Sequence, residues 1–257
     1  MYVCPMDSPG RHAGILDRLR RDGRVDVGDL AEAFTTSEVT VRRDLDALAD
    51  AGVLRRVHGG AVSLLLRGEE LPFAMREMDS AATKDRMGAA VASLVQEGEA
   101  VVVDSGTTGL AVARALVGRR LTVMPLSLHA AAALSATSSV HLLLPGGTVR
   151  HGEGSLVGPI AEANLRSLRF DTTVLTCCGL SPEGGVTAHD VQDAAVKRAA
   201  VAVATRTVLV AEGAKFVRTA LAVVCAASDV DVLVTDHDAP PAALARLREA
   251  GVQVVQA

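Results

Sequence analysis

The 257-residue sequence is poor in aromatic residues, with four phenylalanines, one tyrosine and no tryptophan. Hydrophobic residues still make up 49% of the chain, so its core must be built mainly from alanine, valine and leucine. It has no run of 18 or more uncharged apolar residues that would indicate a membrane span. Its first residues, MYVCPMDSPGRHAG, lack the apolar segment of a secretory signal. We therefore expect a cytoplasmic protein with no membrane partner.

Cysteine is scarce as well, and Cys4, Cys177, Cys178 and Cys225 do not have the spacing of metal ligands. The adjacent pair Cys177–Cys178 lies in an apolar stretch, where thiols usually pack as small hydrophobic groups. The chain also lacks a GxGxxG motif after a strand, a Walker loop and an HExxH motif. The sequence therefore predicts a reduced protein with no metal and no cofactor.

Lysine is the third scarce residue: only Lys84, Lys197 and Lys215 are lysine among 26 basic residues. The formal net charge is −4, so the chain as a whole is acidic. Because this chain so strongly favours arginine, each lysine marks a position where a compact, rotatable ammonium deserves examination.

The first 60 residues have the periodicity of three short helices followed by a hairpin. Gly23 is expected to end the first helix, the second to be entered through Gly28 and Asp29, and Ser37 to be the N-cap of the third. Gly52 is expected as the C-cap of the third helix. The helices span 11–22, 27–34 and 37–50, with apolar stripes Ile15, Leu16 and Leu19; Val27, Leu30 and Phe34; and Val41, Leu45 and Leu48. A strand at 53–57 then turns at Gly59-Gly60, which is typical of a wing.

The outward face of the third helix indicates DNA binding. Arg42 and Arg43 lie beside Thr40 there, and arginine can bond guanine bidentately in the major groove. Arginines on the wing would contact the DNA backbone. The alternative is a solvated helix face on which Arg42 and Arg43 pair with Asp46 and Asp50. The candidate DNA-binding residues are Ser37, Val39, Thr40, Arg42, Arg43, Arg55, Arg56 and His58.

Beyond a linker at 63–80, which contains Pro72, short apolar strands alternate with amphipathic helices. This alternation predicts an α/β domain with a largely parallel sheet. The expected strands are at 100–104, 121–126, 140–147, 172–179, 207–212, 231–236 and 252–256. The expected helices are at 83–96, 108–117, 127–135, 158–168, 190–204 and 240–250. We therefore divide the chain into a winged helix-turn-helix domain at 1–62, the linker, and an α/β domain at 81–257.

Several predicted strands end in small residues or are followed by a cation, and parallel strands place such ends at one edge of a sheet. Hydroxyls and backbone N–H groups at the start of a helix can bind an anion. The alternatives are that Ser105 and Thr107 merely cap a helix and that the lysines are exposed charges. The candidate effector-binding residues are Asp104, Ser105, Gly106, Thr107, Thr108, Gly146, Gly147, Arg150, Lys197 and Lys215.

The stretch TTSEVTVRRDLDALADAGVLRRVHGGA at 35–61 resembles the N-terminal signature of the DeoR-type repressors, which are bacterial winged helix-turn-helix regulators. The matching positions are Ser37, Thr40, Arg42 to Leu45, Leu48, Gly52 and Arg56 to Ala61. The resemblance extends over about nine-tenths of the chain. It implies an effector domain similar in fold to ribose-5-phosphate isomerase, with family positions at Asp104, Gly106, Thr107, Thr108, Gly146, Gly147, Lys197 and Lys215.

One motif departs from the family. An Asp-Ser-Ser-Lys type of run is usual, and here the residues are Glu212-Gly213-Ala214-Lys215, with a longer acid and two hydroxyls fewer. This departure leaves the identity of the effector open.

These features predict a DNA-binding transcription regulator, most simply a repressor, and not an enzyme. Its expected partners are double-stranded operator DNA, a small phosphorylated sugar or related anion, and further copies of itself in a homodimer or higher homo-oligomer. The alternative is a sugar-phosphate isomerase with an appended DNA-binding module, in which Asp104 or Glu212 would carry a proton and Lys197 or Lys215 would hold phosphate.

Overall fold

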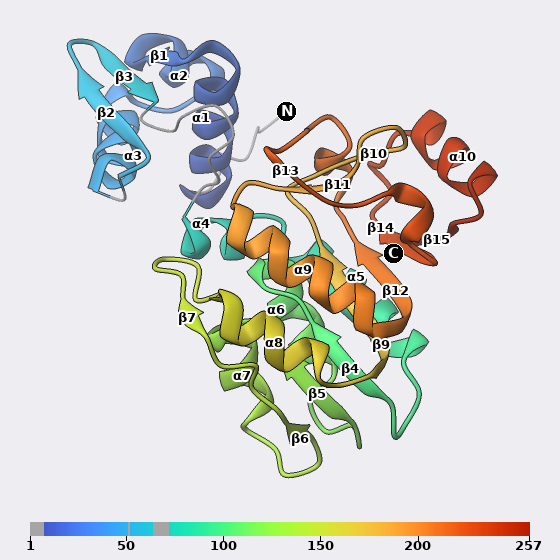
Figure 1. Ribbon diagram of the computed structural model, residues 1–257. Coiled ribbons are helices and arrows are strands. Elements are labelled where there is room, and N and C mark those ends of the chain that lie inside the picture. Colours follow the sequence, from blue (N-terminus) through green and yellow to red (C-terminus); the bar gives the residue numbers. More distant parts are fainter. Residues whose placement is uncertain (1–7, 51, 64–71) are drawn as a thin grey trace. The chain divides into compact units, whose positions relative to one another are not determined.

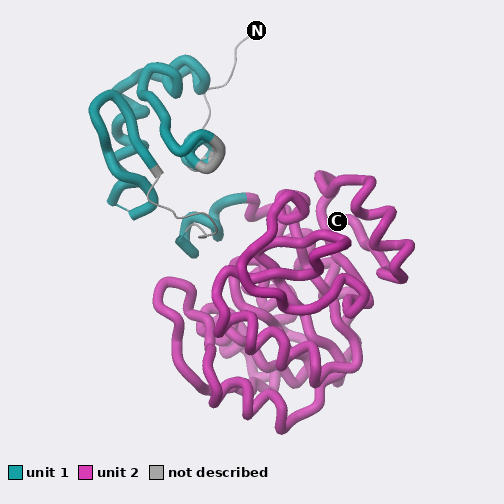
Figure 2. Tube along the Cα trace, turned by 45° about the horizontal axis from the view of Figure 1, so that its top comes forward, with its two compact units in different colours: residues 1–79 teal, residues 80–257 magenta. Residues whose placement is uncertain are grey.

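A computed structural model describes residues 8–50, 52–63 and 72–257. The chain forms two compact units, Met1–Asp79 and Ser80–Ala257, shown in different colours in Figure 2, and each is described by itself. Cys4 and residues 64–71 of the predicted linker lie outside the described residues. Within the predicted linker range the structure contains a short helix, α4 (Phe73–Met78), which the periodicity did not indicate.

The first unit consists of three longer helices, α4 and a small antiparallel sheet (Figure 1). The helices preceding α4 are α1 (Ser8–Asp22), α2 (Val27–Ala33) and α3 (Glu38–Asp50). The strands are β1 (Arg24–Asp26), β2 (Leu54–Val57) and β3 (Gly60–Ser63), in the order β1-β3-β2. The predicted helices and hairpin are thus confirmed, and β1 adds a third strand to the wing.

The apolar stripes predicted from the sequence form the core of this unit. Ile15, Leu30, Val41, Leu45 and Leu48 are all fully buried. At the start of α3, Ser37 acts as the expected N-cap, because its Oγ accepts a hydrogen bond of 3.1 Å from the Thr40 backbone N–H.

Two details of this unit follow from backbone geometry. The prediction that α2 is entered through Gly28 and Asp29 was wrong: the helix begins at Val27, and Asp26 is the N-cap that accepts a 3.0 Å bond from the Gly28 N–H. At Gly60 an added Cβ would lie 2.0 Å from the Val25 carbonyl oxygen. Only glycine therefore lets β1 pair with the wing, which is why the hairpin has this residue at its turn.

The second unit is built on a seven-stranded parallel sheet in the order β15-β14-β12-β9-β4-β5-β6. Its strands are β4 (Ala100–Val103), β5 (Thr122–Pro125), β6 (His141–Leu142), β9 (Phe170–Thr176), β12 (Ala204–Val210), β14 (Val232–Thr235) and β15 (Gln253–Gln256). All seven expected strands are present, although β6 is much shorter than the apolar run 140–147 that predicted it.

Helices cover both faces of this sheet, as the alternating pattern predicted (Figure 1). One face packs against α5 (Ala81–Leu94), α6 (Gly106–Ala115) and α7 (Leu128–Leu134), through strand residues such as Val101, Val103 and Val208. The other face packs against α8 (Pro159–Arg166), α9 (Val191–Val203) and α10 (Pro241–Glu249), through alternate residues such as Val102 and Leu209.

The periodicity did not indicate the short antiparallel elements. A two-stranded hairpin is formed by β7 (Thr148–Val149) and β8 (Leu156–Val157). A three-stranded sheet is formed by β10 (Gly179–Ser181), β11 (Gly185–Ala188) and β13 (Ala222–Cys225). Single 3-10 turns follow β12 and β13, as η1 (Gly213–Lys215) and η2 (Ala227–Asp229).

The cysteines of the second unit pack largely as predicted. Cys177 and Cys225 are buried, and Cys178 is half-buried. Burial, with a smaller contribution from the charge of Asp229, raises the pKa of the Cys225 thiol to about 12, so this group stays protonated near neutrality. Cys177 and Cys178 follow the end of β9 and do not lie within the strand.

Candidate functional site

The sheet order creates a topological switch point between β4 and β9. From β4 the chain proceeds outward to β5 and β6, then returns to β9 on the other side of β4 and proceeds through β12, β14 and β15. Open α/β sheets bind ligands at the carboxyl ends of the strands where the order reverses in this way. Asp104 follows β4, and Thr176 ends β9, so both lie at this point of the sheet.

Asp104 is buried, and the protein itself supplies four hydrogen-bond donors to its carboxylate. Oδ1 accepts a 2.7 Å bond from the Ser105 N–H. Oδ2 accepts bonds of 2.8 and 2.9 Å from the backbone N–H and hydroxyl of Thr176, and a further bond from the Lys197 ammonium. Asp104 thereby ties together β4, β9 and α9.

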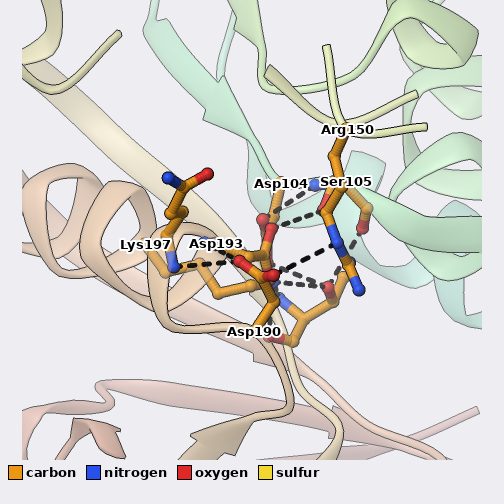
Figure 3. Close-up of polar contacts among 8 residues, drawn as sticks. Asp104, Ser105, Arg150, Asp190, Asp193 and Lys197 are labelled. Carbon is orange, nitrogen blue, oxygen red and sulfur yellow. Dashed lines mark hydrogen bonds and ion pairs between the residues drawn. The ribbon is translucent and has the colours of Figure 1, made fainter. Parts of the chain in front are cut away.

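Lys197 reaches Asp104 from α9 and also pairs with Asp193, one turn earlier, at 3.4 Å. Burial lowers the pKa of Lys197, but the charges of Asp104 and Asp193 outweigh this effect and raise it above the ordinary value. Lys197 is therefore charged at all physiological pH values. Figure 3 shows these three side chains converging.

Asp193 is a carboxyl group whose charged form is disfavoured by its surroundings. Its burial raises the pKa more than the neighbouring Lys197 ammonium lowers it, and the charge of Asp104 raises it further. Two buried carboxylates thus share one buried ammonium, which leaves the cluster with an excess of negative charge if both are ionised.

The start of α6 lies beside this cluster. Ser105 occupies the N-cap position, but its hydroxyl makes no capping bond and instead donates to Asp193 Oδ1 at 3.3 Å. The first N–H groups of α6 therefore receive no side-chain cap from Ser105, contrary to the simple capping alternative. An added Cβ at Gly109 would lie 2.1 Å from the Asp104 carbonyl oxygen, so glycine is needed for α6 to approach the end of β4 this closely.

Arg150 approaches the cluster from the turn between β7 and β8 (Figure 3). Its Nε lies 3.4 Å from Oδ2 of Asp190, and its charge lowers the pKa of Asp193. Asp190 is the N-cap of α9, and its Oδ1 accepts bonds of 2.9 Å from the N–H groups of Gln192 and Asp193. The hairpin is thereby joined to the helix that carries Lys197.

The remaining predicted effector residues are placed as follows. Thr107 is buried and Thr108 half-buried on the first turn of α6, which begins at Gly106. Lys215 is half-buried on η1, beyond the end of β12. Gly146 and Gly147 have φ values of +71° and +96°, and a Cβ at Gly147 would lie 2.5 Å from the Val157 carbonyl oxygen. Backbone geometry alone therefore requires Gly147.

On the DNA-binding candidate helix, the predicted outward residues are exposed. Val39 is 55% exposed, Arg42 and Arg43 are exposed, and Thr40 is half-buried, with its hydroxyl 2.9 Å from that of Ser37. Arg42 pairs with Glu38 at 2.6 Å and not with Asp46 or Asp50. Arg43 makes no hydrogen bond or ion pair with any residue that the structure describes.

The two wing arginines differ in their contacts. Arg55 and His58 are exposed. Arg56 pairs with Asp46 of α3 at 2.9 Å, and its Nη1 donates to the Gly60 carbonyl at 3.1 Å. Arg56 therefore fastens the wing to α3, whereas Arg55 projects from the other side of the strand.

An ion network around the buried carboxylate of Asp44 was not expected from the sequence. Asp44 accepts bonds of 2.7 and 3.1 Å from Arg11, and His12 lies 3.1 Å from the same carboxylate. Burial raises the pKa of Asp44, but the hydrogen bonds and charges of Arg11 and His12 lower it below its usual value. This network joins α1 to α3.

Two family models match parts of the chain. A model described as the DeoR-like helix-turn-helix domain matches residues 11–65, and one described as the DeoR C-terminal sensor domain matches residues 79–237. The chain belongs to the DeoR family. It is a DNA-binding transcriptional regulator.

Relatives in this family are similar over nearly their whole length. The transcriptional repressor AccR of Agrobacterium fabrum is 35% identical over 88% of each chain. A putative aga operon transcriptional repressor of Escherichia coli O157:H7 is 32% identical over 95% of this chain and 92% of its own. The glycerol-3-phosphate regulon repressor of Escherichia coli K12 is 29% identical over 97% of this chain and 99% of its own.

Among solved structures, ribose 5-phosphate isomerase A of Methanocaldococcus jannaschii overlaps 54% of this chain and 55% of its own, with 13% identity and a TM-score of 0.39. This partial overlap does not indicate an activity. Within the described residues no group of His, Cys, Asp or Glu side chains is arranged to hold a metal ion, and no helix is long and apolar enough to cross a membrane.

The departure from the usual DeoR-family motif at Glu212-Gly213-Ala214 has a structural explanation at Gly213. An added Cβ there would lie 2.5 Å from the backbone carbon of Asp238 and 2.6 Å from the Ala239 nitrogen. The Gly213 N–H also donates to Asp236 at 3.0 Å. The loop after β14 is thus closed onto Gly213, and a serine could not be accommodated without a shift of backbone.

Sequence reasoning missed three residues that contact the candidate site: Thr176, Asp190 and Asp193. Asp193 and Lys197 have the i, i+4 spacing of a helical ion pair, and Asp190 precedes a helix in the manner of an N-cap, so both carried a local signal. Thr176 carried none, because its importance depends on which strand packs next to β9.

Proposed function

We propose that this DeoR-family protein is a transcriptional repressor whose affinity for its operator changes when a phosphorylated sugar or a related anion binds to the sensor domain. The observation that carries the proposal is the buried cluster of Asp104, Asp193 and Lys197 at the switch point of the sheet, next to the start of α6. The names of the relatives, which include repressors of the glycerol-3-phosphate regulon and the aga operon, support it.

The anionic group of the effector would bind the first N–H groups of α6, at Gly106, Thr107 and Thr108, where the helix dipole favours negative charge. Arg150 would supply positive charge, with Lys215 as a further candidate. Lys197, which is 3% exposed and paired with two carboxylates, would act by holding Asp104 and Asp193 beside the start of α6. Because protein donors occupy the carboxylate of Asp104, we propose that it positions Lys197 and Thr176, in place of the direct contact with sugar hydroxyls that its acidity suggests.

On the DNA side, we propose that Thr40 and Arg43 contact base edges in the major groove, with Val39 beside them. Arg42, Arg55 and His58 would contact phosphates. Ser37 and Arg56 would act mainly by holding α3 and the wing in place, since their side chains bond within the unit. Symmetric operators require symmetric proteins, so we propose at least a homodimer that acts in the cytoplasm.

The isomerase alternative is less favoured. An acid that carries a proton must reach the substrate, whereas Asp104 is 2% exposed and fully bonded to the protein. We expect no interconversion of aldose and ketose phosphates by the purified protein.

Direct binding tests the effector site. A panel of sugar phosphates is screened by thermal shift, where a ligand at 100 times its dissociation constant stabilises by about 2.7 kcal/mol, and the best ligand is titrated calorimetrically. Lys197→Gln should weaken binding at least tenfold, and Lys197→Arg should restore little, because the site of Lys197 is only 3% exposed and has no room for a planar guanidinium.

Arg198→Gln is the matched control, since Arg198 is exposed on the same helix and bonds the Val223 carbonyl. Hydrogen exchange in α9 verifies that each variant is folded. Equal affinity of the parent and Lys197→Gln for the ligand would place the effector elsewhere.

A further inference from the structure

The buried cluster at the start of α6 holds more negative than positive charge. Asp104 and Asp193 share the ammonium of Lys197, and the three side chains are 2%, 12% and 4% exposed (Figure 3). The neighbouring pair of Arg150 and Asp190 contains one charge of each sign, so it leaves this imbalance unchanged. With both shared carboxylates ionised, an anion that binds at the start of α6 would add to an excess of negative charge that already exists.

The two carboxylates differ in the donors that hold their charge. Asp104 accepts bonds of 2.7, 2.8 and 2.9 Å from two backbone N–H groups and the Thr176 hydroxyl, in addition to the bond from the Lys197 ammonium. Among the described residues, the Asp193 carboxylate has two partners, the Ser105 hydroxyl at 3.3 Å and the Lys197 ammonium at 3.4 Å. Donors of this kind stabilise the charged form of a carboxyl group. Asp193 is therefore the member of the cluster that a proton neutralises at the lower cost in free energy.

Ser105 connects Asp193 to the place proposed for the anion. Its hydroxyl donates to Asp193 Oδ1, and the first N–H groups of α6 follow Ser105 directly in the chain. Charges interact more strongly in a site with little water than in bulk solvent. A negative charge at these N–H groups therefore acts on Asp193 and disfavours its ionised form.

Charged and titratable groups approach Asp193 from several parts of the fold. Burial raises the pKa of Asp193, the Lys197 charge lowers it, the Asp104 charge raises it again, and the Arg150 charge lowers it. The groups are Lys197 and Asp190 on α9, Asp104 after β4, Arg150 in the turn between β7 and β8, and the Cys178 thiol after β9, which interacts with Lys197. An anion at the start of α6 would act on Asp193 in the same direction as Asp104 does.

We propose that Asp193 takes up a proton when an anion binds at the start of α6, so that the sensor site binds its effector together with a proton. This proposal rests on the proposed effector site. The proton comes from solvent and adds to one carboxylate oxygen of Asp193, which leaves Asp104 and Lys197 with equal and opposite charges. The new O–H can donate a hydrogen bond to the anion, which the carboxylate would repel. By linkage, the affinity for the effector falls as pH rises.

Calorimetry with the full chain in two buffers of different ionisation enthalpy, Tris and HEPES, measures this proton. The probe is the tightest binder in the panel of sugar phosphates, which includes glycerol 3-phosphate, ribose 5-phosphate and fructose 6-phosphate. At about pH 8 the second ionisation of a phosphate ester, with its pKa of about 6, is nearly complete. The difference in binding enthalpy should correspond to uptake of about half a proton or more per bound phosphate. The affinity should fall about threefold to tenfold for each unit of pH.

Asp193→Asn is the decisive variant, because its amide cannot take up the proton. Its binding enthalpy should be the same in both buffers, and its affinity should not change with pH. Asp171→Asn is the matched control, since Asp171 is exposed at the amino end of β9 and accepts a 2.8 Å bond from the Ala100 N–H. This control should take up the proton as the parent does. Hydrogen exchange in α9 verifies that each variant is folded.

The phosphorus chemical shift of the bound probe provides a second measurement, which needs the parent alone. The shift should remain that of the dianion between about pH 7 and pH 9, which would leave the proton on the protein.

Equal enthalpies in the two buffers for the parent, a bound phosphate that is itself protonated, or uptake that persists in Asp193→Asn would each overturn the role of Asp193 alone. In those cases Lys197→Gln would still weaken binding, and the proposed effector site would stand. If no sugar phosphate of the panel binds the parent, the effector site and the role of Asp193 fail together.

Discussion

The two units of this protein each contain a group of opposite charges around a buried side chain, and the two groups are arranged differently. In the DNA-binding unit one carboxylate, Asp44, is matched by Arg11 and His12, and its pKa is lowered. In the sensor unit one ammonium, Lys197, is shared by Asp104 and Asp193, and the pKa of Asp193 is raised. The first group joins two helices around one carboxylate, whereas the second holds two carboxylates around one ammonium at the switch point of the sheet.

We propose that this difference separates a structural ion network from the proposed effector site. Buried charges are tolerated when every charge has its partner, and removal of one partner is strongly destabilising. An excess charge with a shifted pKa at a strand end is instead a common feature of functional sites. The comparison predicts that substitutions in the first group affect folding and that substitutions in the second affect ligand binding.

The largest expected effect is on the network around Asp44. Asp44→Asn removes the negative charge to which Arg11 donates two hydrogen bonds and should destabilise the DNA-binding unit by about 3–5 kcal/mol. Hydrogen exchange of peptides from α1 and α3 measures the loss. Asp46→Asn on the same helix is the control, because Asp46 is exposed and pairs with Arg56 at the surface, where such pairs contribute about 0–1 kcal/mol. Similar losses in both variants would contradict the structural role of the network.

The exposed arginines of α3 should behave in the opposite way, with an effect on binding and none on folding. Arg43→Ala should weaken binding to an operator selected from a random duplex library by about 1–3 kcal/mol and relax its sequence preference. Arg42→Ala, whose parent side chain already pairs with Glu38, should weaken specific and non-specific DNA more evenly. Fluorescence anisotropy with the operator and a scrambled duplex measures both. An unchanged affinity in Arg43→Ala would remove this residue from base recognition.

In the sensor cluster, Asp193→Asn replaces a carboxylate whose charged form is disfavoured, so the variant should lose much less stability than Asp44→Asn does. It should still lower the affinity for the effector several-fold, because the Ser105 hydroxyl and the Lys197 ammonium lose their shared partner. Calorimetry and hydrogen exchange in α9 separate the two effects. A loss of stability as large as that of Asp44→Asn would show that the two groups are equivalent.

The smallest expected effect concerns pH: the contributions of Asp44 and Asp193 to the stability of their units should change with pH in opposite directions. Because the pKa of Asp44 is lowered on folding, its ionisation stabilises the DNA-binding unit above the unfolded value of about 3.9, and this stabilisation is lost as pH falls through the lower folded pKa. The pKa of Asp193 is raised, so its contribution to the sensor unit is favourable at low pH and is lost as pH rises through the raised folded pKa.

This difference is measured by hydrogen exchange, corrected for intrinsic rates, in the parent and the two Asn variants between about pH 3 and pH 7. For Asp44, the advantage in stability of the parent over Asp44→Asn should shrink as the pH is lowered. For Asp193, the stability of the parent relative to Asp193→Asn should increase as the pH is lowered. The same trend at both positions would mean that their environments do not differ as described.

Much of the fold could be predicted from the sequence because its signals are local. The stripe of Val41, Leu45 and Leu48 and the N-cap Ser37 are read within one helix, and the parallel strands are recognisable as apolar runs between helices. The antiparallel strands β10, β11 and β13 were missed. Each is three or four residues long, and β13 pairs with a strand more than 30 residues earlier.

The candidate site was predictable only in its outline. Asp104, Ser105 and Lys197 were expected to meet because strands of one sheet end together, although Asp104 and Lys197 are 93 positions apart. The sequence could not show that Thr176 and Ser105 bond the two carboxylates. Those partners depend on the packing of whole helices against the sheet.

The most direct test of the account is the affinity for the selected operator, measured by fluorescence anisotropy with and without a saturating sugar phosphate from the screen. It is made for the parent and for the double variant Asp193→Asn/Lys197→Gln, which removes the buried ammonium together with one of its carboxylates. The parent should change its operator affinity by at least about fivefold when the ligand binds, and the variant should bind the operator equally well with and without the ligand. A variant that responds to the same ligand as fully as the parent would contradict the assignment of this cluster as the effector site.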